Sequence, residues 1–256
     1  MEGGTIWKGT IHFGDTDVAV KLHSAVRESR VQFHLLHASD QVRLRQQMFC
    51  AFENLPVPAE EQAKGFELEQ GKYVIVGPEE LERTASEYSR MIEVHEFVKI
   101  AEIDPLFLDH VYYLEPDAQA KGYPALVRTL QDLGVSGICT WTMRKRSYLG
   151  ALQGSGKVLR LSTLRHADEV IPRETLDLRH VPLSEKELGI GSELIDKLTV
   201  PFAPEKFENE HQKKLLHMID KKIRGEKIAL QPPKLLIPTE SDKLLQALEA
   251  SLKKAA

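Results

Sequence analysis

The chain has 256 residues, of which 42% are hydrophobic and 28% charged, the balance of an ordinary soluble globular protein. It holds no apolar run near the roughly 20 residues that span a bilayer, and its first residues lack the basic start and apolar stretch of a signal peptide. Two cysteines, Cys50 and Cys139, fit a reducing compartment and are too few for a cysteine-only zinc site. We therefore expect a cytoplasmic protein without a membrane partner.

The formal net charge of −4 excludes a surface that is basic over the whole exterior. The charge is uneven along the chain. From Glu205 onward there are 11 Lys and Arg against 8 Asp and Glu, so the preceding residues carry −7. Contacts with DNA phosphates need only a local basic surface, so nucleic acid remains a possible partner.

The first fifth of the chain alternates with a period of two, which predicts antiparallel strands covering a core. Residues 14–17 have turn composition, and the pattern then resumes. One face of the alternation carries Trp7, Gly9, Ile11, Phe13, Val18, Val20, Leu22, Val31, Phe33 and Leu35.

Further elements follow in order. A strand is expected over 71–76 and a short helix from Pro78. The apolar spacing from Tyr123 to Leu133 predicts a helix that Gly134 ends. Alternation over 138–146 then predicts a strand with Cys139, Trp141 and Met143 on one face and Thr140, Thr142, Arg144 and Arg146 on the other. Cys139 is thus interpreted as a core residue.

After residue 184 the pattern becomes helical. Ser184 to Glu187 resembles a capping box and precedes an amphipathic run through Leu198; a second helix is expected over 206–224. Gln231-Pro232-Pro233 marks a linker. The tail then predicts a short amphipathic helix, either a partner-binding peptide or a frayed terminus, with the leucines Leu244, Leu245, Leu248 and Leu252.

Residues 150–157 resemble a phosphate-binding P-loop, but Ala151 and Val158 stand where the motif requires glycine and Ser or Thr. The segment also lies between two predicted strands, which favours a hairpin turn and rejects ATP binding. His34 and His37 point to opposite faces of a strand and are interpreted as structural. We find no catalytic motif, so we expect no enzyme and no cofactor.

Basic residues recur on the predicted strands and hairpins. Arg43 and Arg45 share one face of an extended segment, and so do Arg144 and Arg146. Each is most simply a solvated surface charge. Together with Arg160 and Arg165 they could instead line a groove that contacts phosphates without reading bases.

An ordered set of segments resembles the prokaryotic Ku proteins over roughly residues 5–225. The segments are 7–14, 20–22, 33–37, 64–67, 71–80, 96–98, 103–105, 112–116 and 164–170. Their order, more than any one motif, carries the resemblance.

The resemblance implies a mainly β fold with α: a Ku-type β-barrel with a bridge that forms half of a DNA-encircling ring, followed by a C-terminal helical arm. It implies a core over 1–184 with the bridge at about 24–75, a helical dimerisation arm over 185–225, a linker over 226–238 and a tail helix over 239–256. The residues expected nearest the DNA are Lys21, Arg43, Arg45, Arg144, Arg146 and Arg165.

The same resemblance implies a nucleoid-associated homodimer that loads onto double-stranded DNA ends without sequence preference. It would recruit an ATP-dependent DNA ligase D through the tail, for double-strand break repair by non-homologous end joining. Where many relatives carry a C-x-x-C-G motif, this chain keeps only Cys50, so no metal site is carried over. The alternative function is a protein-interaction scaffold that acts through the tail and has little DNA affinity.

Overall fold

The structure is a computed structural model that describes residues 4–27, 30–84, 89–117, 120–177, 184–226 and 244–255. The chain divides into two compact units, which are treated separately. The first contains residues 1–29 and 34–173, and the second contains residues 30–33 and 174–256.

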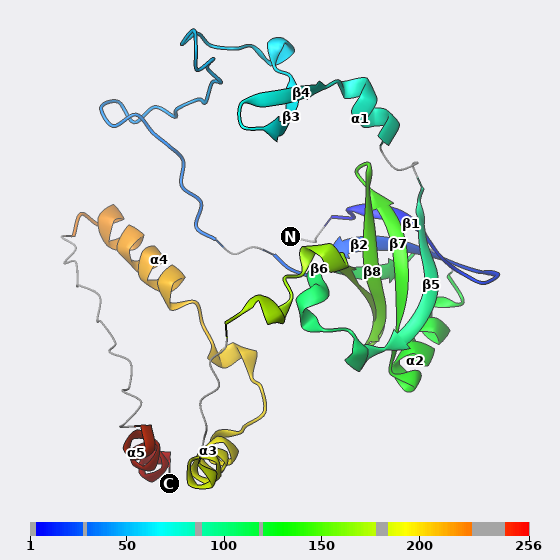
Figure 1. The fold of residues 1–256 in the computed structure, drawn as a ribbon, viewed down its shortest axis with the longest axis vertical. Coiled ribbons are helices and arrows are strands. Elements are labelled where there is room, and N and C mark those ends of the chain that lie inside the picture. Colours follow the sequence, from blue (N-terminus) through cyan, green and yellow to red (C-terminus); the bar gives the residue numbers. More distant parts are fainter. Residues whose placement is uncertain are drawn as a thin grey trace. The chain divides into compact units, whose positions relative to one another are not determined.

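In the described part of the first unit, seven strands close into a barrel (Figure 1). Around the barrel the order is β1-β2-β6-β9-β8-β7-β5. Neighbouring strands are antiparallel except β1 and β5, which pair in parallel and close the sheet. The strands are β1 Trp7–Phe13, β2 Thr16–Ser24, β5 Met91–Lys99, β6 Leu108–Pro116, β7 Val135–Met143, β8 Arg146–Ser155 and β9 Val158–Leu164.

The barrel interior is the hydrophobic core that the alternation predicted. Ile11, Val20 and Leu22 are completely buried, and Trp7 and Phe13 pack against the same cluster while remaining partly exposed. Cys139 and Trp141 of β7 also lie inside, which confirms their assignment to the core. Because each fully buried aliphatic side chain contributes roughly 1.5–3 kcal/mol, this cluster is the main source of barrel stability.

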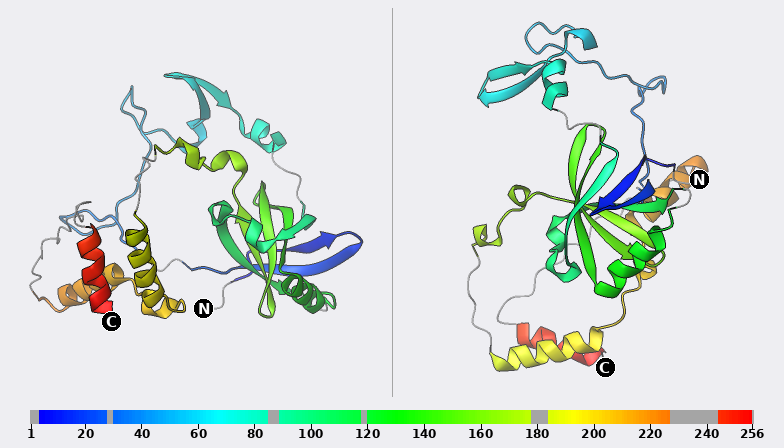
Figure 2. Two further views of the ribbon diagram at one scale, coloured as in Figure 1. Left: turned by 60° about the horizontal axis from the view of Figure 1, so that its bottom comes forward. Right: turned by 90° about the vertical axis from the view of Figure 1, so that its right-hand side faces the viewer.

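Helix α2, Tyr123–Leu133, lies against one end of the barrel (Figures 1 and 2). The Tyr123 hydroxyl donates to the Leu114 carbonyl of β6 and accepts the Leu159 amide of β9 at 2.8 Å. A Cβ at Gly154 would collide with the Val127 carbonyl oxygen, so glycine permits the close approach of α2 to β8. The 150–157 glycines therefore serve strand packing and the β8–β9 turn, and the predicted hairpin is confirmed.

Between β2 and β5 the chain leaves the barrel. Residues 30–63 contain isolated bridges and one 3-10 turn but no strand in their described conformation. The prediction that the strand pattern continues through Val31, Phe33 and Leu35 is therefore wrong. Among the described residues no strand pairs with residues 31–35, and Phe33 and Leu35 are 67% and 68% exposed.

The excursion continues in a hairpin of β3, Lys64–Glu69, and β4, Lys72–Val76, and in helix α1, Pro78–Thr84. The strand near 71–76 and the helix start at Pro78 are confirmed. The short 3-10 helices found in the described part of the chain are Ala59–Glu61, Ile100–Glu102, Pro105–Phe107, Ala167–Glu169, Arg173–Thr175 and Pro204–Lys206.

The second unit holds α3, Glu185–Leu198, α4, Glu210–Ile223, and α5, Leu244–Ala255. The predicted capping box is present: the Glu187 amide donates to Ser184 Oγ at 3.2 Å, and Glu187 Oε2 accepts the Ser184 amide at 2.7 Å. Helix α4 begins at Glu210, later than the predicted 206, because Asn209 caps it by accepting the Gln212 amide.

Helix α5 packs against α3, and both views of Figure 2 place the two helices side by side. Lys186 of α3 and Glu249 of α5 approach within 3.7 Å. The predicted linker beyond Glu226 and residues 239–243 of the predicted tail helix lie outside the described residues.

Candidate nucleic-acid interface

The turn between β7 and β8 concentrates positive charge. Met143 pairs with Arg146, and the two residues between them, Arg144 and Lys145, both have a positive φ, of 52° and 66°. A two-residue hairpin turn needs this left-handed backbone, which Asn-Gly usually supplies. The prediction of one strand through 138–146 is therefore wrong, and Arg144 and Arg146 do not share a strand face. The clue in the sequence was three consecutive cations between two alternating runs.

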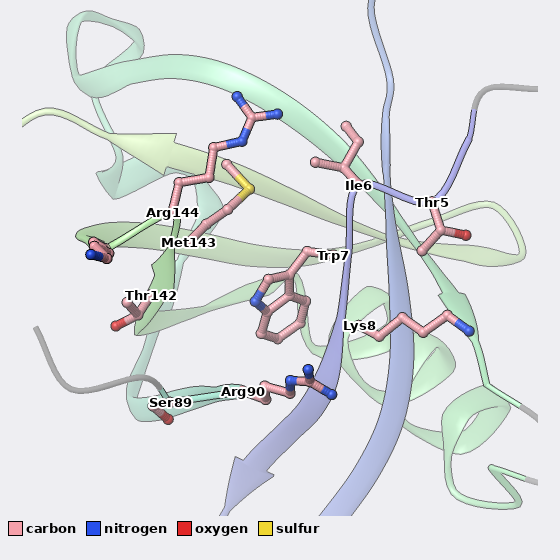
Figure 3. A pocket seen from close by; sticks show the side chains of 10 residues that line it. Thr5, Ile6, Trp7, Lys8, Ser89, Arg90, Thr142, Met143 and Arg144 are labelled. Atoms are coloured by element: carbon pink, nitrogen blue, oxygen red, sulfur yellow. The ribbon is translucent and has the colours of Figure 1, made fainter.

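Beside this turn is a pocket of about 310 Å³ centred on Trp7 (Figure 3). The first strand, the start of β5 and the β7–β8 turn supply its walls. The lining residues are Thr5, Ile6, Trp7, Lys8, Ser89, Arg90, Thr142, Met143, Arg144 and Lys145. None of them is acidic. The pocket therefore has the composition of a site for an anion with an apolar part.

Local backbone features shape this pocket. A Cβ at Gly9 would collide with the Trp7 ring and with the Arg90 carbonyl oxygen, so glycine lets the indole fold across β1. The Arg90 carbonyl accepts the Thr10 amide at 2.9 Å, which fixes Arg90 beside Trp7. Trp7 rests edge-on against the buried Trp141, with ring centroids 5.9 Å apart. The indole is thus held in one place by its surroundings.

The cations of the pocket differ in their partners. Lys145 Nζ lies 2.7 Å from Glu82 Oε1 of α1, and this hydrogen bond lowers the pKa of Glu82. Arg90 and Arg144 have no ion-pair partner among the residues that the structure describes. Lys8 lines the rim, and its side chain extends away from the indole in Figure 3. Sequence reasoning singled out Arg144 here but missed Arg90 and Lys145.

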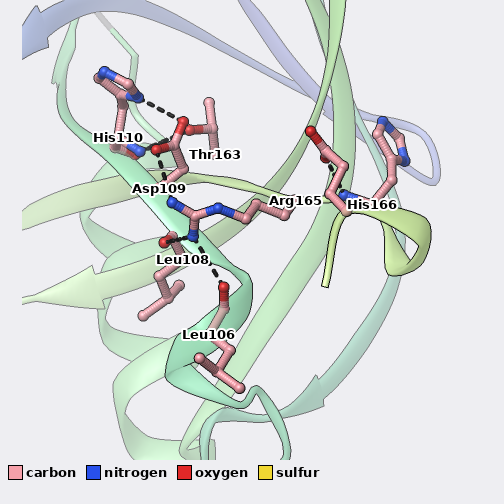
Figure 4. A network of polar contacts seen from close by, with 8 residues as sticks. Leu106, Leu108, Asp109, His110, Thr163, Arg165 and His166 are labelled. Carbon is pink, nitrogen blue, oxygen red and sulfur yellow. Dashed lines mark hydrogen bonds and ion pairs between the residues drawn. The ribbon is translucent and has the colours of Figure 1, made fainter. Parts of the chain in front are cut away.

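Arg165 has a different environment from the one expected of a free DNA contact. Its guanidinium donates to the Leu106 carbonyl at 2.9 Å, to the Leu108 carbonyl, and to Asp109 Oδ1 at 3.2 Å (Figure 4). Its own amide donates to the Phe107 carbonyl. Arg165 therefore secures the beginning of β6, and contact with DNA stays a prediction.

Lys21 is also engaged within the chain. Its ammonium lies 3.1 Å from Asp117 Oδ1, and this hydrogen bond raises the pKa of Lys21. Arg43 and Arg45 are exposed on the excursion, where they line a second hollow with Val42, Leu44 and Gln46. Arg146 is exposed at the start of β8. No single surface is established that joins these residues, so their shared role stays a prediction.

Two similar loops lie in the excursion. Leu36 bridges Arg43, Phe49 bridges Pro56, and each loop contains one non-glycine residue with positive φ, Gln41 at 59° or Asn54 at 55°. His37 and Cys50 occupy the same place in the two loops. His37 pairs with Asp40 at 3.0 Å, and the backbone amides of Glu53 and Phe52 lower the pKa of Cys50. Within the described residues, no three His, Cys, Asp or Glu side chains come together to hold a metal.

The leucines expected to bind a partner can be placed only in part. Leu248 is half-buried within α5, and the side chains of Leu244, Leu245 and Leu252 lie outside the described part. Their role in partner binding stays a prediction. None of the described helices combines the length and the apolar character needed to cross a membrane.

The barrel corresponds to a known domain: residues 12–190 match the model of the Ku70/Ku80 β-barrel domain. The chain belongs to the Ku family. Among its Ku relatives, "Non-homologous end joining protein Ku 2" of Geotalea uraniireducens (strain Rf4) is 69% identical over the full length of both chains. A Ku protein of Heliobacterium modesticaldum is 37% identical over 97% of this chain and 91% of its own, and one of Anaeromyxobacter sp. is 35% identical over 96% and 85%.

Proposed function

We propose that the protein binds double-stranded DNA ends, independently of sequence, in double-strand break repair by non-homologous end joining. The observation that carries this proposal is the 69% identity over the whole chain to a protein named for non-homologous end joining. The closed barrel in the described residues supplies the folded scaffold for this role.

We further propose that the protein acts as a homodimer whose two chains form a ring around the duplex. The β3–β4 hairpin supports this. Two strands alone are marginally stable in water, and this hairpin exposes apolar side chains on both faces. These are Phe66, Leu68, Tyr73, Val74 and Ile75, between 47% and 68% exposed. A second copy of the chain would cover them in a twofold interface.

Within the ring, the residues proposed to lie nearest the phosphates remain Lys21, Arg43, Arg45, Arg144, Arg146 and Arg165. Arg144 and Arg146 have the strongest support, because Arg144 lies in the β7–β8 turn, Arg146 follows it at the start of β8, and no described acid pairs with either. Positive charge concentrated at these residues is compatible with a net charge of −4, because phosphate contacts depend on the charge of the local surface.

The tail is proposed to recruit an ATP-dependent DNA ligase D. Its support is an amphipathic helix α5 joined to the arm by a stretch rich in proline. Deleting residues 239–256 should leave DNA binding intact and reduce stimulation of the ligase. Loss of DNA binding in this deletion would contradict the division of roles.

The deciding experiment compares linear duplex with a closed circle of the same sequence. A ring loads only at an end, so we expect a mobility shift on the linear duplex and little on the circle. Log affinity should fall steeply with log salt as counterions are released. Equal binding to both DNA forms would overturn end recognition.

A further inference from the structure

The pocket around Trp7 contains more than the positive charge that is needed to bind the phosphate backbone of a duplex. The pocket contains one half-exposed indole and two arginines that have no ion-pair partner among the described residues. Thr5, Ser89 and Thr142 add three hydroxyl groups. Duplex phosphates would use the arginines, but internal base faces are hidden in a stacked helix, and a terminal base pair is too large for a pocket of about 310 Å³. An unpaired nucleotide presents both a phosphate and an open base face.

The geometry points to a ligand of matching size. A volume of about 310 Å³ is at the lower end of small-molecule pockets, which hold roughly 300–1,000 Å³. It suits one nucleotide and not a long segment. The indole is fixed by Gly9 and Trp141, so a base can stack on it without first ordering a mobile ring.

We infer that this pocket binds a single unpaired nucleotide at a DNA end, with its base against Trp7 and its phosphate held by Arg90 and Arg144. Lys145 at the rim is paired with Glu82, so Arg90 and Arg144 supply the positive charge that faces the phosphate. This inference rests on the proposed function, because it assigns to the DNA-end binder a site for the overhang. It gives the pocket a preference for ends with unpaired nucleotides over blunt ends.

The test measures the affinity of the full-length protein for three probes: a linear duplex with a short unpaired overhang, the same duplex with blunt ends, and deoxyadenosine monophosphate. The variants are Trp7→Leu, Trp7→Phe, Arg90→Gln and Arg144→Gln. Arg128→Gln is the charge-matched control, since Arg128 lies on α2 outside the pocket. Trp7 and Trp141 are the only tryptophans, so quenching of intrinsic fluorescence that is absent in Trp7→Phe reports on Trp7.

We expect Trp7→Leu to weaken overhang binding about five- to fifty-fold, Trp7→Phe to restore much of it, and blunt-end affinity to stay unchanged. Arg90→Gln should weaken overhang binding while leaving the Trp7 indole in place. It should also reduce the slope of log affinity against log salt by about 0.7, because one phosphate contact is lost. Because Trp7 also packs on the core, Arg90→Gln decides the matter if Trp7→Leu fails to fold. Arg144→Gln should weaken binding of both duplexes, since Arg144 is also proposed to contact duplex phosphates.

Three results would overturn the inference. Equal losses for overhang and blunt ends in Trp7→Leu or Arg90→Gln would make the pocket a general DNA contact, and unchanged affinity for both would remove it from DNA binding. If the mononucleotide bound as tightly as the overhang, the site would belong to free nucleotides. Failure of the proposed function is separate, because it would appear in wild-type protein as equal binding to linear and circular DNA.

Discussion

Arg144 and Lys145 stand next to each other in the left-handed backbone region, a conformation that suits neither side chain. Such a residue costs about 1–2 kcal/mol relative to glycine or asparagine in the same place. The turn thus carries two cations where Asn-Gly would fold more easily. Both of these strained residues also line the Trp7 pocket.

Replacing the pair with Arg144→Asn/Lys145→Gly should raise stability by about 1 kcal/mol, after allowing for the entropy of the added glycine and the lost ion pair between Lys145 and Glu82. The same change should weaken DNA binding, because two charges are lost. Thermal unfolding and DNA titration measure the two effects. The control Arg144→Gln/Lys145→Gln removes the charges and keeps the strain, so a rise in its melting temperature would contradict the argument.

Arg165 can be dissected with two substitutions. Arg165→Ala should destabilise the barrel by about 1–3 kcal/mol, because the Leu106 and Leu108 carbonyls lose their charged donor. Arg165→Lys keeps the charge but not the forked geometry. It should lose stability while retaining affinity for DNA, measured by denaturant unfolding and DNA titration. If both variants are fully folded and lose DNA affinity equally, the positive charge of Arg165 is not what contacts the DNA.

Acid should weaken the contact between α1 and the β7–β8 turn. The pKa of Glu82 is lowered from 4.5 by the hydrogen bond from Lys145. A lowered carboxyl pKa gives stability that is present above 4.5 and is lost as the pH falls through the lowered value. Melting temperatures of wild type and Glu82→Gln should therefore converge in acid and differ at neutral pH. A difference independent of pH would point to packing instead of charge.

The two cysteines should differ in reactivity. Burial raises the pKa of Cys139 to about 12, whereas backbone amides lower that of Cys50. A thiol reagent at mildly alkaline pH should label Cys50 in the folded protein and both residues after unfolding, as mass spectrometry can show. The raised pKa also gives stability that is complete below about pH 9 and is lost as the pH rises toward 12. Rapid labelling of native Cys139 would show that the barrel opens.

If the β3–β4 hairpin forms the proposed dimer interface, polar substitutions on it should weaken self-association. Ile75→Ser removes an apolar side chain that is 68% exposed in the single chain. It should leave the melting of the barrel unchanged and weaken self-association, which light scattering measures. Lys72→Ser, on the same strand but polar, is the control. If both variants associate like wild type, this hairpin does not form the interface.

The sequence predicted the barrel well because its strands alternate cleanly around buried residues such as Ile11 and Leu22. The strand predicted through Phe33 and Leu35 is absent, because the described structure offers no neighbouring strand with which this alternating segment could pair. The pocket could not be predicted, since Trp7, Arg90 and Arg144 meet only when β5 closes against β1. Local patterns hold no information on such closure.

The parallel pairing of β1 with β5 makes the segment between β2 and β5 an insertion into the barrel. β2 and β5 are the two neighbours of β1, so the chain departs from one side of this strand and returns on the other. Leu22 pairs with Trp7 and Met91 pairs with Thr10, so Ser24 and Met91 are about five residues apart along β1 as well as two strand spacings apart across it. The gap is roughly 19 Å, which about six residues could span. The whole excursion between Ser24 and Met91 is thus an insertion that barrel closure does not require. A shortened chain should fold as an autonomous domain, so the scaffold can form during synthesis before any second subunit is met.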